Sequence, residues 1–157
     1  MKQVHHIVVS VFEKNPRNLS LIYDRLHDLL PVDFEREKIE ITHEEVEGLT
    51  GDIIHILKLE TRKSRHNKLV LSNIFNNLSM EEKKLIVEQR ASRLNNEGYF
   101  FIRLDKPSLM EKRYVLTDSG NCFHFKIKLA AYPANPKQFM VTLEKLLSEV
   151  GCPPPEI

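Results

Sequence analysis

The chain has 157 residues, of which 41% are hydrophobic and 29% are charged, and its formal net charge is +1. This composition is typical of a globular domain and excludes a disordered or fibrous chain. No apolar run approaches the roughly 20 residues of a membrane helix, and no secretory signal pattern is present, so we expect a cytoplasmic protein that binds no membrane. Cys122 and Cys152 stand in unrelated contexts, which indicates free thiols.

Charge is distributed unevenly along the chain. Residues 33–60 are rich in acids, whereas residues 61–80 and 119–143 contain basic residues and no acid. This asymmetry is a weak indication of an anionic partner, because charges that are separate in sequence often balance on a folded surface. The basic residues of the two acid-free stretches are Arg62, Lys63, Arg65, Lys68, Lys126, Lys128 and Lys137.

The first third of the chain predicts a strand, a helix and a β-hairpin. Residues 4–12 alternate in part and are rich in β-branched side chains, which is typical of a strand. Asn15–Pro16 is expected to begin the following helix, and Pro31 to end it. Two further alternating segments, residues 38–46 and 52–61, predict the paired strands of a hairpin.

Two helices are predicted next. Ser64 is expected to cap the first of them. Ser79 and Glu82 form a capping box, in which each side chain accepts a hydrogen bond from the other residue's backbone, and this signal begins the second helix. We expect Leu85, Ile86 and Leu94 to face inward from this second helix.

The last third of the chain predicts two strong strands and a final helix. Residues 99–104 and 122–131 both alternate, and residues 113–116 are a candidate for a shorter strand. Asn135–Pro136 repeats the earlier helix-start signal, and Gly151 stands where a helix C-cap glycine belongs.

This order of elements predicts an α+β fold: a mixed, mostly antiparallel sheet with helices packed on one face. No interior linker or low-complexity segment divides the chain. We therefore expect one domain over residues 1–151, followed by a short tail at 152–157.

No catalytic motif is recognisable in the sequence, and we expect the protein not to be an enzyme. A GxSxG nucleophile motif and a glycine-rich phosphate loop are both absent. Cys122 and His124 share one face of a predicted strand, but their Cα atoms are about 6–7 Å apart there. We interpret Cys122 as a structural residue and not as a nucleophile.

The seven histidines predict no metal site and no cofactor. They form no HxH or HExxH motif, we expect no carboxylate at ligand spacing from them, and the adjacent His5 and His6 point to opposite faces of a strand. Asp105 and Asp118 lie at predicted strand ends near basic residues, so a small metal-dependent nuclease stays open as an alternative.

Two predicted strands carry the residues that suggest a nucleic-acid partner. Tyr99, Phe101 and Arg103 face away from the predicted core, in a segment that resembles the base-stacking motif of RNA recognition motif domains without its leading basic residue. Lys126 and Lys128 project from one face of the later strand, where a row of ammonium groups attracts phosphates without reading sequence. An ordinary solvated sheet face explains the lysine pattern equally well.

Three segments resemble an archaeal family of predicted RNA-binding proteins associated with the exosome: VHHIVVSVF, YFFIRLDKPSLM and LTDSGNCFHFKIKLAAYP. The resemblance covers the chain from Val4 to about Val150. Its most specific parts are RLDK (Arg103–Lys106), LTDSG (Leu116–Gly120) and KIKLAAYP (Lys126–Pro133).

The resemblance implies a fold similar to a ribosomal large-subunit protein that grips ribosomal RNA. It also implies RNA binding and a role beside the RNA-degrading exosome, and it supplies no catalytic residue. Applied to this chain, it favours Arg103, Lys106, Lys126 and Lys128 as RNA contacts.

The sequence therefore predicts a non-catalytic RNA-binding protein that is an accessory factor of the exosome. Tyr99 or Phe101 would stack a base. The alternatives are an adaptor that docks on the exosome or the ribosome through an apolar patch, and the nuclease described above. The residues predicted to contact phosphates are Arg62, Lys63, Arg65, Lys68, Arg103, Lys106, Lys126 and Lys128.

Overall fold

The structure, a computed structural model, describes residues 2–156. Within these residues one sheet contains five strands, in the order β2-β3-β1-β5-β4, and every neighbouring pair is antiparallel. The strands are β1 (Val4–Glu13), β2 (Ile41–Glu47), β3 (Ile53–Thr61), β4 (Tyr99–Asp105) and β5 (Cys122–Leu129). The helices are η1 (Pro16–Asn18), α1 (Leu19–Leu29), α2 (Ser64–Asn77), α3 (Met80–Glu88), α4 (Lys106–Met110) and α5 (Pro136–Glu149).

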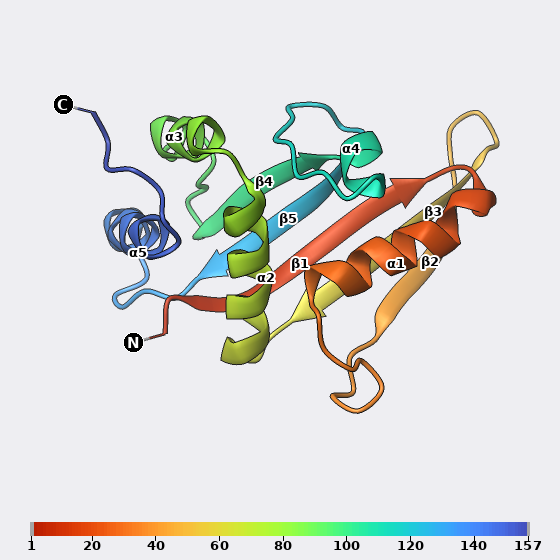
Figure 1. The fold of residues 1–157 in the computed structure, drawn as a ribbon, viewed down its shortest axis with the longest axis horizontal. Coiled ribbons are helices and arrows are strands. Elements are labelled where there is room, and N and C mark those ends of the chain that lie inside the picture. The colour runs from red at the N-terminus through yellow and green to blue at the C-terminus, as the bar shows by residue number, and fades with distance from the viewer. Residues whose placement is uncertain (1, 157) are drawn as a thin grey trace.

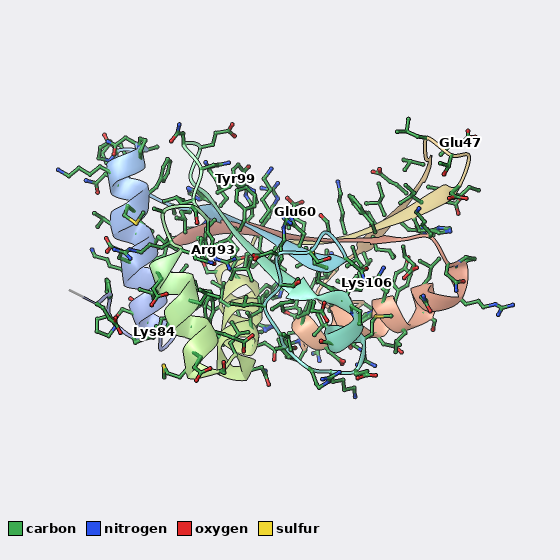
Figure 2. All side chains as sticks on the ribbon, turned by 90° about the horizontal axis from the view of Figure 1, so that it is seen from above. Glu47, Glu60, Lys84, Arg93, Tyr99 and Lys106 are labelled. Atoms are coloured by element: carbon green, nitrogen blue, oxygen red, sulfur yellow. The ribbon has the colours of Figure 1, made fainter. Side chains whose placement is uncertain are left out.

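The helices leave one face of the sheet uncovered. Figures 1 and 2 show α1, α2, α3 and α4 on one side of the sheet, with α5 lying across the end at which β5 finishes. On the opposite side, Figure 2 shows side chains that project from the strands with no helix above them. We call this uncovered side the open face.

The core lies between the sheet and the helix layer. Side chains alternate across a strand, so Val9 and Val11 of β1 and Phe125 of β5 point at the helices and are fully buried. Ile74 and Phe75 of α2 cover them from the other side and are also fully buried. Burial of this apolar surface stabilises the fold by roughly 25 cal/mol per Å², and it fixes which side chains are left on the open face.

The structure confirms the predicted α+β class and several of the predicted helix starts. Ser79 and Glu82 form the capping box at α3, with hydrogen bonds of 3.0 and 3.1 Å. Asn135 caps α5 by accepting from the Gln138 N–H at 2.9 Å. Asn15 caps a short 3-10 turn that leads directly into α1.

Three local predictions were wrong. Ser64 is the first residue of α2 and does not cap it: the N-cap residue is Lys63, whose side chain accepts no helix N–H. Leu85 is 40% exposed, since Ile86 and Val87 occupy the inner side of α3.

The third concerns the segment after β4. Residues 113–116 form only an isolated bridge, Leu104 to Leu116, because the chain first turns through α4. Asp105 starts that helix by accepting from the Ser108 N–H at 3.1 Å. Cys152, the first residue of the predicted tail, is buried in the core cluster, and burial raises the pKa of its thiol to about 11.

Candidate nucleic-acid interface

The β4–β5 half of the open face gathers aromatic and basic side chains from three strands. The register sets Tyr99 opposite Lys128, Phe101 opposite Lys126 and Arg103 opposite His124. On the other side of β5, Lys128 is opposite His6 of β1. We call this set the basic face; its residues are His6, Tyr99, Phe101, Arg103, His124, Lys126 and Lys128.

Alternation along two neighbouring strands produces this arrangement. Phe100 and Ile102 of β4 and Phe125 and Ile127 of β5 are fully buried against the helices. The residues between them must therefore point the other way. The predicted division of these two strands into an inner and an outer face is confirmed.

The rings of the basic face lie in a row. The ring centroids of Tyr99 and Phe101 are 6.5 Å apart, those of Phe101 and His124 are 5.5 Å apart, and those of His6 and Tyr99 are 6.0 Å apart. These rings are half-buried, and nucleic-acid bases stack on the accessible faces of such rings irrespective of the base sequence. The row therefore offers successive surfaces for unpaired bases.

Ammonium groups flank these rings. The Lys126 Nζ lies 4.2 Å from the centre of the Tyr99 ring and the Lys128 Nζ 4.9 Å from it. Lys128 also donates to the Glu97 carbonyl. Within residues 2–156 no ion pair joins Arg103, Lys126 or Lys128 to an acid, so these charges are available to phosphates.

The two histidines of the basic face are held neutral near pH 7. Burial lowers the pKa of His124, and the nearby cations Arg103 and Lys126 lower it further. Burial is also the largest cause that lowers the pKa of His6, followed by the charge of Arg62. A neutral imidazole stacks as a flat ring. It takes up a proton and a positive charge when its pKa rises to the pH of the solution.

We expect RNA affinity to rise as the pH falls below about 6.5, the ordinary pKa of histidine. Phosphates at Arg103 and Lys126 would offset the charges that now depress the pKa of His124. The pKa of His124 would then be higher in the complex than in the free protein, so binding takes up a proton and is favoured by acid. His124→Gln should flatten this increase.

The measurement is the affinity for an oligouridylate, whose bases do not titrate here, between pH 8 and 5.5. His27→Gln changes a histidine outside the basic face and serves as the control. A profile of equal steepness in His124→Gln and in the unmodified chain would contradict the role given to His124.

A recess of ≈ 430 Å³ opens beside the basic face. Phe101, Arg103 and His124 line one part of it, and Arg93 lies at its wall. The Arg93 guanidinium is fixed there by the Gln89 side-chain oxygen, at 3.1 and 2.7 Å, and by the Phe101 carbonyl at 3.3 Å. The recess thus adds a second guanidinium at the end of the ring row.

The predicted basic cluster at residues 62–68 does not join this surface. Arg62 lies at its border and is paired with Glu60 at 2.9 Å. Lys63, Arg65 and Lys68 stand at the beginning of α2, on the helix side of the sheet.

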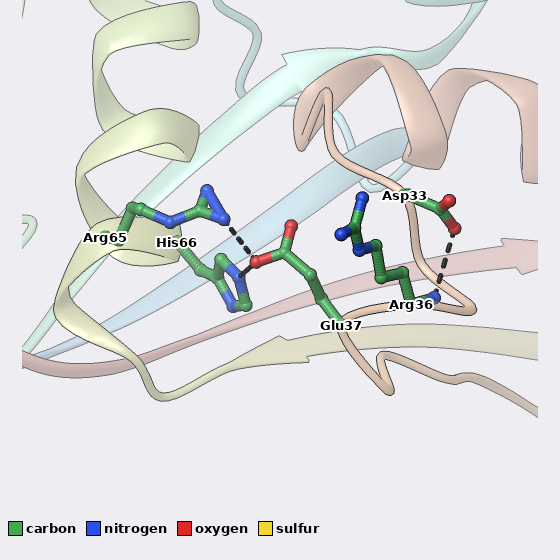
Figure 3. A network of polar contacts seen from close by, with 5 residues as sticks. All are labelled: Asp33, Arg36, Glu37, Arg65 and His66. Carbon is green, nitrogen blue, oxygen red and sulfur yellow. Dashed lines mark hydrogen bonds and ion pairs between the residues drawn. The ribbon is translucent and has the colours of Figure 1, made fainter.

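Figure 3 shows how Arg65 is engaged: Glu37 accepts from Arg65 and from His66, the latter at 3.0 Å. The hydrogen bond from His66 is the largest cause that lowers the pKa of Glu37, so its carboxylate is charged near neutral pH. Arg65 therefore has an internal partner. The expected single platform is confined to β4, β5 and the beginning of β1.

Lys106 was predicted to contact RNA and lies instead in the interior. Its exposure is 8%, and its Nζ lies 2.8 Å from Glu13 and donates to the Phe12 carbonyl at 2.5 Å. Burial acts to raise the pKa of Glu13, but hydrogen bonds from Lys106 and the Asn15 N–H outweigh it and leave the pKa lowered. Lys106 therefore ties α4 to β1 and is removed from the candidate surface.

Lys106→Ala is expected to destabilise the fold by about 3–5 kcal/mol, because it leaves the Glu13 carboxylate buried without its partner. Urea denaturation measures this loss. Lys84→Ala is the control, since its pair with Glu156 is exposed and its loss should leave the urea midpoint almost unchanged. If Lys106→Ala unfolds at the same urea concentration as the unmodified chain, the pair has no structural role.

The two candidate nuclease carboxylates have separate surroundings. Asp105 accepts from the Ser108 N–H and, at 2.6 Å, from its hydroxyl, which makes it a helix cap. Asp118 lines the recess near Arg93 and Arg103. Neither belongs to a group of three potential metal ligands among the described residues.

Sequence reasoning missed two contributors to this surface. Arg93 follows α3 in an irregular segment, and only the bridge of Leu94 to Phe100 brings it beside β4. His6 was assigned to a strand but not to the basic face, because its position beside Lys128 depends on the pairing of β1 with β5. No local sequence signal marks either residue.

An uncovered antiparallel sheet with a row of rings among unpaired cations defines a surface for anionic ligands that carry planar groups. The family model described as "RNA binding" matches residues 6–129. The chain belongs to this RNA-binding family.

The chain is also similar to proteins from archaea. It is 26% identical over 131 residues to the RNA-binding protein PAB1135 of Pyrococcus abyssi (strain GE5 / Orsay). The aligned residues make up 83% of this chain and 85% of that protein.

Two solved structures have a similar fold. The protein AF2318 of Archaeglobus fulgidus superimposes with a TM-score of 0.79 at 21% sequence identity. The superposition covers 91% of this chain and 99% of the AF2318 chain. Mth689, a DUF54 protein of Methanothermobacter thermautotrophicus, has a TM-score of 0.71 at 22% identity and covers 93% and 99%.

None of the helices found within residues 2–156 combines the length and the apolar character that crossing a membrane requires.

Proposed function

We propose that this chain binds single-stranded RNA on the basic face, without catalysing a reaction. One observation carries the proposal: half-buried rings and cations without an acidic partner, from separate strands, converge on the one side of the sheet that no helix covers. Rings take bases that are free of pairing, and the cations take the phosphates between them. Membership of the RNA-binding family supports the same function.

The arrangement favours single strands over duplexes. In an RNA duplex the bases are stacked on each other, and the deep, narrow major groove denies side chains access to their edges. The row of rings formed by Tyr99, Phe101 and His124 can engage only bases that have left such a stack. The recess beside Arg103 offers room for the last of these bases or for a terminal phosphate.

Fluorescence anisotropy with a labelled single-stranded RNA tests the proposal. Three cations, Arg103, Lys126 and Lys128, predict that log K falls against log salt with a slope of about −2, at about 0.7 per phosphate contact for single strands. The same RNA annealed to its complement is the control and should bind more weakly. Equal affinity for both forms, or no dependence on salt, would contradict the proposed surface.

A second proposal concerns a protein partner, and it rests on the other half of the open face. Phe12 of β1 is 59% exposed, and it lies opposite Ile56 of β3. Val46 of β2 is exposed opposite Ile54. Exposed apolar surface of this kind is typical of a docking site, which suits an accessory factor or adaptor of the exosome or the ribosome.

Together the two proposals describe a cytoplasmic factor that presents RNA to a larger assembly. Sedimentation of the chain with a purified archaeal exosome tests the second one, using Phe12→Asp to charge the apolar half. Co-sedimentation that Phe12→Asp abolishes supports an adaptor role. The same variant should bind single-stranded RNA as the unmodified chain does when no exosome is present, so the two functions can be distinguished.

A further inference from the structure

Two histidines and a glutamate meet on the β2–β3 hairpin, on the opposite side of the sheet from the basic face. His43 and Glu45 are two residues apart on β2, so their side chains share one side of that strand. The register places Glu45 opposite His55 of β3. The expectation that no carboxylate stands at ligand spacing from a histidine was therefore wrong, because the spacing of a strand is two residues.

The ligand atoms of this triad are already close. The His43 Nε2 lies 2.9 Å from the His55 Nδ1, and the Glu45 Oε1 lies 3.7 Å from the same Nδ1. One such atom from each of the three residues fits within a span of 4.8 Å. His55 is 7% exposed, whereas His43 and Glu45 are exposed on the outer strand of the sheet. The triad thus has one fixed member and two that solvent reaches.

We propose that His43, Glu45 and His55 bind a divalent late first-row transition metal ion such as Zn²⁺. Zinc binds imidazole nitrogens at about 2.0–2.1 Å and carboxylate oxygens at a similar distance, so tetrahedral ligand atoms lie about 3.3 Å apart. The observed separations of 2.9 and 3.7 Å lie on either side of this value. Small rotations of the two exposed side chains are enough to reach it.

The chemistry of the donors selects the class of ion. Two imidazoles suit zinc, nickel, cobalt or copper, whereas magnesium and calcium take oxygen ligands almost alone. The carboxylate supplies one negative charge. Three protein ligands leave a further coordination position open to solvent, as in sites that hold a water or an exchangeable ligand.

The charged groups near the triad do not repel a cation. Glu13 of β1, the strand next to β3, lies opposite His55 in the register. The nearby Lys106 is engaged by that carboxylate at 2.8 Å. The position on an outer strand also gives the ion a direct path from solvent.

Titration of the untagged, chelator-treated full chain with Co²⁺ and Zn²⁺ tests the site. Co²⁺ is followed by visible absorption and Zn²⁺ by calorimetry, and we expect one ion per chain. His43→Gln and Glu45→Gln should each lower the affinity at least tenfold, while both variants keep the circular dichroism of the unmodified chain because the two positions are exposed.

His5→Gln is the matched control, since His5 is an exposed histidine on β1 outside the triad. Zn²⁺ should raise the melting temperature of the unmodified chain and of His5→Gln, because ligands that bind only the folded state stabilise it. This rise should shrink in His43→Gln. Absence of one-to-one binding, undiminished affinity in both triad variants, or its loss in His5→Gln would overturn the proposal.

Discussion

Lys126→Glu is expected to weaken binding of single-stranded RNA by about tenfold to a hundredfold, because it replaces a phosphate contact by a repulsion, and charge-assisted bonds carry about 1.5–3 kcal/mol each. Lys126 lies in the middle of the basic face and has no acidic partner among the described residues. The slope of log K against log salt should also become less steep by about 0.7. Anisotropy titrations at several salt concentrations give both quantities.

Lys84→Glu is the matched control for this prediction. It makes the same change in net charge, but Figure 2 shows Lys84 on α3, on the far side of the sheet from Tyr99. Its affinity should stay within about twofold of the unmodified chain, since long-range charge effects are screened beyond about 10 Å at 0.1 M salt. Equal losses in Lys84→Glu and Lys126→Glu would indicate a nonspecific charge effect and no defined surface.

Tyr99→Ala is expected to lower RNA affinity by about 1–3 kcal/mol, which corresponds to roughly fivefold to a hundredfold, because it removes one stacking surface. Tyr99 contacts both lysines of the row, with centroid distances of 4.2 and 4.9 Å to their Nζ atoms. Unlike the lysine variant, it should leave the salt slope unchanged, since no counterion is released at an aromatic ring.

The control is Phe12→Ala, which removes an exposed ring from the apolar half of the same open face. Its RNA affinity should match that of the unmodified chain, and Tyr99→Phe should restore most of what Tyr99→Ala loses. If Phe12→Ala weakens binding as much as Tyr99→Ala does, the RNA crosses the whole sheet, and the confinement to β4 and β5 is wrong.

Local sequence patterns predict much of the fold. The alternation of residues 122–131 separates the buried core side chains from the half-buried lysines of the open face, and the Ser79 and Glu82 capping box marks the first turn of α3 correctly. These signals succeed because burial and hydrogen-bond satisfaction act within a few residues. The side of the sheet on which Tyr99, Phe101 and Lys126 lie follows from the same periodicity.

Contacts between distant segments were beyond such reasoning. Lys106 follows the exposed Arg103 in an apparently basic motif, yet the chain turns at Asp105 and directs it to Glu13, 93 positions earlier. Arg65 is engaged by Glu37 for the same reason. Both were predicted to contact phosphates, because their acidic partners are separated from them in sequence.

The triad of His43, Glu45 and His55 also depends on a contact between separate segments, and the sequence-based prediction missed it. His43-x-Glu45 is visible in the sequence as a strand pair, but His55 joins it only through the register of the hairpin. A one-residue shift in pairing would have turned His55 to the open face. Register is decided by packing of the whole sheet, so the site emerges only in three dimensions.

The most direct test of the account is a two-dimensional NMR titration of the chain with single-stranded RNA. The basic face predicts that amide shifts change most along residues 99–103 and 124–128 and near His6. Shifts concentrated at Lys63, Arg65 and Lys68 on α2, with β4 and β5 unaffected, would contradict the claim that the uncovered side of the sheet holds the RNA.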